Sequence, residues 1–241
     1  MTRLISAMKM DVTVQVRSNL YAIGIGVGVI LAAALIWLAD PNHLFSIIPT
    51  LMLLVVGGST MLYVAAIIIF EKDEGTLNAV IVSPLRTSEY LWSKIITLTA
   101  LATIESVIMF GGAMAFMYWF DELILPNVLL LLIGIMSIGV IYTLIGIILI
   151  VRFDKITDFI IPLSAVAMVL QAPALYFLGA ITHPVFLVIP TSAPTMIMQG
   201  AYTQLTTWQW LYAVGFTIAL VVGLTIWSYY AFKKHIIRKV G

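Results

Sequence analysis

The side chains that could carry chemistry in this sequence are few. Its 241 residues contain 12 Lys and Arg, 11 Asp and Glu, three His and no Cys. The absence of cysteine excludes disulfides and thiolate metal ligands. The sequence has no Gly-x-x-x-x-Gly-Lys-Ser/Thr loop for a nucleoside triphosphate, no His-Glu-x-x-His helix and no Gly-x-Ser-x-Gly turn. His43, His183 and His235 form no cluster in sequence, so we expect no metal site. We therefore predict a chain without a catalytic centre or cofactor of its own.

Glu105 is the one acid that falls well inside a long apolar stretch. A charge at the centre of a membrane helix costs about 2.5–3.5 kcal/mol on insertion scales, so such a residue is expected to face protein or a wet cavity. Two roles remain open: contact with a polar or cationic substrate, or a purely architectural hydrogen bond. Gln171, which lies between Pro162 and Pro173, is a weaker candidate of the same kind.

The segment 71–94 is the most informative polar stretch. Acidic residues begin it, an apolar run follows, and a Ser-Pro pair stops that run before a new helix begins. This pattern predicts a short surface helix with an apolar side, and such a side favours a protein or membrane partner. A plain solvated loop is the alternative. The apolar residues that we expect to meet a partner are Leu77, Val80, Ile81 and Val82.

The elements that must position these residues are membrane helices. Hydrophobic residues make up 62% of the chain and charged residues 10%, and mean hydropathy is +1.12. A soluble domain is about 45–50% apolar and about 25% charged. A span needs about 20 apolar residues. Six stretches qualify, and we predict an all-α polytopic membrane domain with spans at approximately 20–38, 47–70, 95–120, 128–151, 159–178 and 208–232.

The charge distribution predicts the orientation of these spans. With six spans, all 12 Lys and Arg residues fall on one side, in the two termini and in the connections 71–94 and 152–158. Among charged residues, the connections on the other side contain Asp and Glu but no Lys or Arg. The positive-inside rule then places both termini in the cytoplasm of a prokaryotic cell, and the clean division supports the number six.

Three further segments complete the predicted architecture. Residues 1–19 are too charged to span and predict an amphipathic helix on the cytoplasmic leaflet, with an ordinary juxtamembrane tail as the alternative. Residues 179–207 are apolar but interrupted by three prolines, which favours broken re-entrant helices over a packed external loop. Gly24, Gly28 and Ala32 repeat at four-residue spacing and predict close helix packing within the chain.

Taken together, the segment 71–94 resembles that of the type-2 permeases of ATP-binding-cassette exporters. The residues that carry the resemblance are Glu71, Glu74, Gly75, Thr76, Leu77, Ser83, Pro84 and Lys94, in that order. Asp11, Gln15, Arg17 and Tyr21 resemble the N-terminal helix of that family, and 190–194 its broken external segment. That family often has an arginine shortly after this segment, where Gln199 stands here.

The resemblance implies a coupling helix that docks onto a cytoplasmic ATPase. The complex would contain two ATPase copies, which hold ATP and Mg, and a second permease subunit of the same or a related kind. Its role would be the outward export of a hydrophobic or amphipathic substrate, and the partners include membrane lipid but no nucleic acid. A secondary transporter is an alternative, against which stand the few intramembrane ionisable groups and the lack of a clear repeat. A membrane scaffold or an intramembrane enzyme is another.

Overall fold

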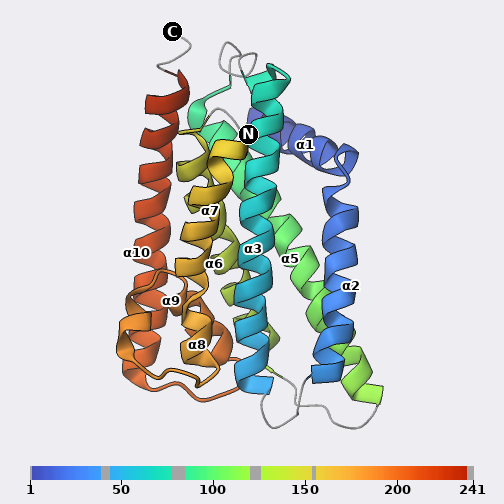
Figure 1. Cartoon of the computed structure of the whole chain (residues 1–241), viewed down its shortest axis with the longest axis vertical. Coiled ribbons are helices and arrows are strands. Elements are labelled where there is room, and N and C mark those ends of the chain that lie inside the picture. Colours follow the sequence, from blue (N-terminus) through green and yellow to red (C-terminus); the bar gives the residue numbers. More distant parts are fainter. Residues whose placement is uncertain (1, 39–43, 78–84, 120–125, 154–155, 238–241) are drawn as a thin grey trace.

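The computed structural model is a helical bundle (Figure 1) and describes residues 2–38, 44–77, 85–119, 126–153 and 156–237. Within these ranges the regular structure is entirely helical, without strands. Six helices are long and apolar enough to cross a membrane, which confirms the predicted class of fold. Helices satisfy their own backbone hydrogen bonds, and lipid requires this of any spanning segment.

The spanning helices agree with the apolar stretches of the sequence, with two differences. The bounds are α2 (Leu20–Leu38), α3 (Leu44–Asp73), α5 (Thr87–Trp119), α6 (Val128–Ile150), α7 (Ile156–Gln171) and α10 (Thr207–Phe232). α5 begins eight residues before the predicted position 95, because the polar residues after 86 continue the same helix. The fifth span is divided, since α7 ends at Gln171 and a short α8 (Pro173–Phe177) follows. Proline has no backbone N–H to continue the hydrogen-bond ladder, which accounts for this break.

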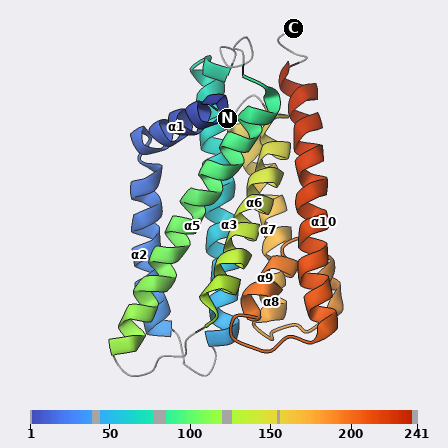
Figure 2. The same cartoon turned by 180° about the vertical axis from the view of Figure 1, so that it is seen from behind.

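The bundle has an enclosed centre and a lipid-like exterior. α3 packs against α5 and α6, and α5 runs obliquely between α2 and α6 (Figure 2). α2 and α10 lie at the two sides of Figure 1 and α7 lies between α10 and α3, and most residues of these three helices are partly or fully exposed. Their outward side chains are large and apolar, for example Ile30, Ile161 and Leu211. Such an exterior suits acyl chains as the surrounding solvent.

The N-terminal segment is a helix, α1 (Thr2–Arg17), that lies across one end of the bundle (Figure 1). Asn19 has a φ of 58°, a left-handed conformation that asparagine tolerates, and the chain turns there into α2. Ile5, Val12 and Val16 point away from the protein, each more than a third exposed, whereas the opposite side packs on α5. An outward apolar side and a position across the spans are what an interfacial helix requires.

The segment before the last span contains two short helices at the opposite end of the bundle (Figure 1). They are a 3-10 helix η2 (Pro184–Val188) and α9 (Ser192–Gln199). Residues 191–198 are all buried, and α9 packs against α6 and α10. The Thr191 hydroxyl donates a hydrogen bond of 2.5 Å to the carbonyl of Leu170. α9 is therefore a short helix covered by protein, whereas η2 has no buried residue, so the predicted burial holds for 191–198 and not for the start of the segment 179–207.

Candidate functional site

A cluster of buried polar side chains fastens α1 to the bundle. Lys94 extends from α5 between two carboxylates, Asp11 of α1 and Glu71 of α3. Its Nζ lies 2.5 Å from Asp11 Oδ1 and also bonds to Glu71 Oε1. Two α5 hydroxyls complete the shell: Ser93 donates to Asp11, and Tyr90 donates to Glu71 over 2.6 Å. We call these five residues the α1 clasp.

The clasp is fully enclosed. The exposed fractions of the Lys94, Asp11 and Glu71 side chains are 0%, 4% and 5%. Burial of charge is costly unless ion pairs and hydrogen bonds compensate, and here each carboxylate has both. One turn further along α1, Gln15 Nε2 donates to Thr97 Oγ1 over 3.1 Å. The clasp therefore supplies rigid attachment among three helices rather than acid–base chemistry.

The clasp changes the interpretation of the segment 71–94. Sequence reasoning placed Glu71 and Leu77 on a surface for a partner, but both are buried inside this chain. Glu71 can be buried because Lys94 pairs with its charge and the Tyr90 hydroxyl donates a hydrogen bond to its carboxylate. Leu77 is 3% exposed and belongs to the core of the bundle. Of the predicted coupling residues that the structure describes, Glu74 remains exposed.

The start of the coupling segment is a tight turn. Gly75 has a φ of 70°, which glycine adopts without steric cost, and the Thr76 hydroxyl donates to the Glu71 carbonyl over 3.2 Å. The backbone of Thr76 and Leu77 is again helical. Val80, Ile81, Ser83 and Pro84 lie outside the described residues. The turn thus sets the direction of the chain directly after the clasp.

Glu105 forms a second buried polar site, inside the bundle. It is 1% exposed, and the Tyr63 hydroxyl of α3 donates to its Oε2 over 3.1 Å. Its other oxygen, Oε1, is buried without a hydrogen-bond partner among the described residues. Such an orphaned acceptor is rare in folded proteins and calls for an explanation. The site can accept a hydrogen bond from a donor that reaches it.

The small residues of α2 make this second site possible. A Cβ atom added at Gly28 would lie 2.9 Å from the backbone oxygen of Glu105, and one at Gly24 would lie 3.2 Å from Tyr63 Oη. Further along the same seam, a Cβ on Gly112 would lie 3.1 Å from that of Ala32. The repeat at 24, 28 and 32 therefore packs α2 onto α5 within one chain, as predicted.

The other candidates have no hydrogen bond to Glu105 among the described residues. Gln171 Nε2 donates to the Leu54 carbonyl of α3 over 3.3 Å, so it contacts a different part of that helix. The Nδ1 atom of His183 accepts a hydrogen bond from the backbone N–H of Val185. His43 is outside the described residues. Among the described residues no group of three His, Asp or Glu side chains could hold a metal ion.

Comparison with known proteins gives a consistent result along the whole chain. The profile of the Fluoroquinolones export permease protein family matches residues 2–240. Two relatives named fluoroquinolones export permease protein come from Mycobacterium tuberculosis, one from strain CDC 1551 / Oshkosh and one from strain ATCC 25618 / H37Rv. Each is 28% identical over 255 residues, an alignment that covers 100% of this chain and 99% of the relative.

Proposed function

Since the chain belongs to the Fluoroquinolones export permease protein family, we propose that it is the membrane subunit of an ATP-driven exporter of amphipathic aromatic drugs. The family match over residues 2–240 carries this proposal, because it includes every described helix. The names of the two mycobacterial relatives suggest fluoroquinolones as the substrate class. An apolar bundle with few buried ionisable groups suits such molecules.

The energy source is a separate ATPase, as in the type-2 permeases that the segment 71–94 resembles. The sequence has no loop of its own for ATP. We propose that two copies of a cytoplasmic ATPase, which bind ATP and Mg, act on a pair of permease subunits. Val80 and Ile81 contact the ATPase, together with the exposed Glu74. Glu71 acts from within the protein, by keeping the turn at Gly75 attached to the clasp.

The end of the bundle that carries α1 faces the cytoplasm. The described lysines and arginines gather at this end, on α1, at the junctions of the spans and at the end of α10 (Figure 1). An impermeant thiol reagent added to intact cells should label His183→Cys but not Lys234→Cys, both exposed positions in a chain without cysteine. The reverse pattern would overturn this orientation.

Co-purification with the ATPase tests the proposed complex. The chain alone should hydrolyse no ATP, whereas the complex should contain equal numbers of permease and ATPase subunits and hydrolyse ATP. Addition of a fluoroquinolone should change the hydrolysis rate. Strong hydrolysis by the isolated permease, or transport that needs only an ion gradient, would contradict the proposal.

A further inference from the structure

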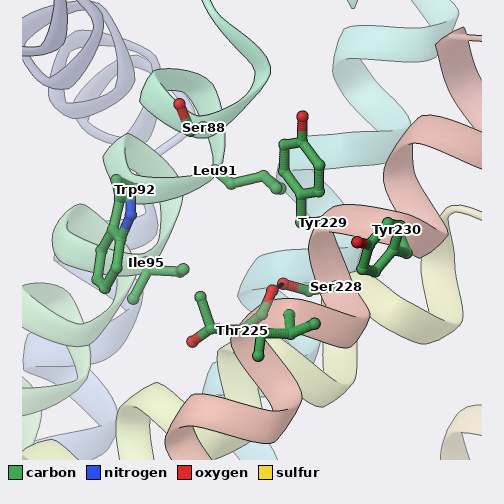
Figure 3. A pocket seen from close by; sticks show the side chains of 9 residues that line it. Ser88, Leu91, Trp92, Ile95, Thr225, Ser228, Tyr229 and Tyr230 are labelled. Carbon is green, nitrogen blue, oxygen red and sulfur yellow. Dashed lines mark hydrogen bonds between the residues drawn. The ribbon is translucent and has the colours of Figure 1, made fainter.

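A groove opens between the start of α5 and the end of α10 (Figure 3). Trp92 and Ile95 project from α5 on one side, and Thr225, Ser228 and Tyr229 project from α10 on the other. The volume is ≈ 290 Å³, near the lower end of the range for sites that hold small organic ligands. The groove lies at the same end of the bundle as the clasp.

The hydroxyl of Thr225 faces a ligand as a hydrogen-bond acceptor. Thr225 is half-buried and donates its proton to the Val221 carbonyl over 2.6 Å, whereas Ser228 is fully buried and donates to the Thr225 carbonyl. A hydroxyl has one donor and two acceptor positions. Because the Thr225 proton is committed to its own helix, the free lone pairs of Thr225 suit a ligand that donates hydrogen bonds, such as a protonated amine.

Aromatic rings supply the rest of the lining. Trp92 is 44% exposed and Tyr230 is 64% exposed, so neighbouring side chains do not cover their rings. Aromatic faces attract cations and stack with other planar rings. Trp and Tyr also gather at membrane interfaces in general. Here, however, Trp92 and Tyr229 come from two different helices and flank one cavity (Figure 3).

Beside the groove, a residue of the clasp joins α5 to α10. Tyr90 and Phe232, both buried, pack with ring centroids 5.0 Å apart and join α5 to α10. The Tyr90 ring also lies 5.2 Å from Lys94 Nζ, and its hydroxyl donates to Glu71. A ligand that changes the spacing of α5 and α10 would therefore also move Tyr90, a residue of the clasp.

We propose that this groove is a binding site for planar aromatic compounds that carry a protonated amine, reached from the leaflet in which α1 lies. The aromatic part stacks against Trp92 and Tyr229, and the amine meets the oxygen of Thr225 and the face of an aromatic ring. This inference rests on the proposed function, because the compounds of this class are the drugs that the exporter would move. The groove is distinct from the buried Glu105 site, which contacts α2 and α3.

Equilibrium binding to the purified permease–ATPase complex tests the site, with radiolabelled ciprofloxacin as the probe. Trp92→Ala and Tyr229→Ala should each weaken binding about 3- to 30-fold. Trp227→Ala is the matched control, because Trp227 is 53% exposed on α10 but does not line the groove. Nalidixic acid, a planar quinolone without a basic amine, should bind more weakly than ciprofloxacin.

Protection of an engineered cysteine from a thiol reagent gives a second measurement, which leaves the aromatic residues of the groove in place. N-ethylmaleimide should modify Ser88→Cys at the groove, and ciprofloxacin should slow that reaction. Thr13→Cys on α1, exposed at the same end, should react at a rate that the drug does not change. A Ser88→Cys that is unreactive without drug would mean that another protein or lipid covers the groove, and would overturn the site.

The outcomes separate this site from the proposed function. Unchanged ciprofloxacin affinity in Trp92→Ala and Tyr229→Ala, with ATP-driven transport intact, would refute the groove and leave the exporter standing. An equal loss in Trp227→Ala would also refute it. Loss of binding in the groove variants of a complex that transports no drug would support the site and refute the exporter.

Discussion

Replacement of Lys94 by methionine tests whether the clasp holds α1 in place. The substitution keeps the length and apolar stem of the side chain but removes the cation between Asp11 and Glu71. Both carboxylates stay enclosed, at 4% and 5% exposure. Each retains one neutral donor, from Ser93 or Tyr90, that it also has in the native protein. The loss is therefore that of the ammonium alone.

The structure sets the expected size of the effect. Removal of one partner from a buried ion pair costs about 3–5 kcal/mol, because the remaining charge is left uncompensated. Lys94→Met should lower the free energy of unfolding by about this amount. Asp11→Asn leaves Lys94 paired one to one with Glu71, so we expect a smaller loss, of about 1–3 kcal/mol. The order of the two variants follows directly from the two-to-one stoichiometry of the clasp.

Unfolding of the detergent-solubilised protein measures this difference, followed by circular dichroism during titration with SDS. Lys9→Met is the matched control, since Lys9 is exposed on α1 and its replacement should change stability by less than about 0.5 kcal/mol. If Lys94→Met unfolds like Lys9→Met, the buried ion pairs do not fasten α1 and this reasoning fails.

Three other substitutions test separate parts of the account. Gly28→Ala should destabilise the protein by about 1–3 kcal/mol, since the new Cβ would lie 2.9 Å from the backbone oxygen of Glu105. Gly26→Ala is the control and should not destabilise it, because the space around Gly26 is open. Equal unfolding curves for the two variants would contradict the α2–α5 packing. Glu105→Gln should alter drug-stimulated ATP hydrolysis in assembled complexes if the orphaned oxygen meets substrate. Unchanged hydrolysis per complex together with poor assembly would make the residue architectural. Combined replacement of Val80 and Ile81 by Asp should abolish co-purification of the ATPase while the permease still inserts, and retention of the ATPase would remove these residues from the interface.

The spans were predictable from composition alone, and the N-terminal helix from its charge and the positions of its apolar residues. A stretch of about 20 apolar residues has few alternatives to a membrane helix, and every predicted span overlaps a helix of the structure. The interruption of 179–207 was predictable too, because proline forbids one continuous helix there, but the exposure of 179–185 was not. The spacing of Gly24, Gly28 and Ala32 also indicated a close helix contact correctly.

The clasp was not predictable in the same way. Asp11 and Lys94 are 83 residues apart in sequence, and nothing in a helix that is apolar on most sides shows which face turns inward. Sequence reasoning therefore treated Glu71 as a surface acid, although the structure gives it a buried lysine. One signal could have helped: Asp11 and Gln15 are spaced one turn apart, on a different side of the helix from Ile5, Val12 and Val16. Such a pair predicts a polar contact with the bundle.

ATP-dependent drug uptake into inverted membrane vesicles tests the central claim most directly. Vesicles that contain this chain and its ATPase should accumulate a fluoroquinolone when ATP is added, and should not do so with a non-hydrolysable ATP analogue or with the permease alone. Collapse of the proton gradient should leave the uptake unchanged. Uptake that continues without ATP, or that stops when the gradient is collapsed, would contradict an ATP-driven exporter.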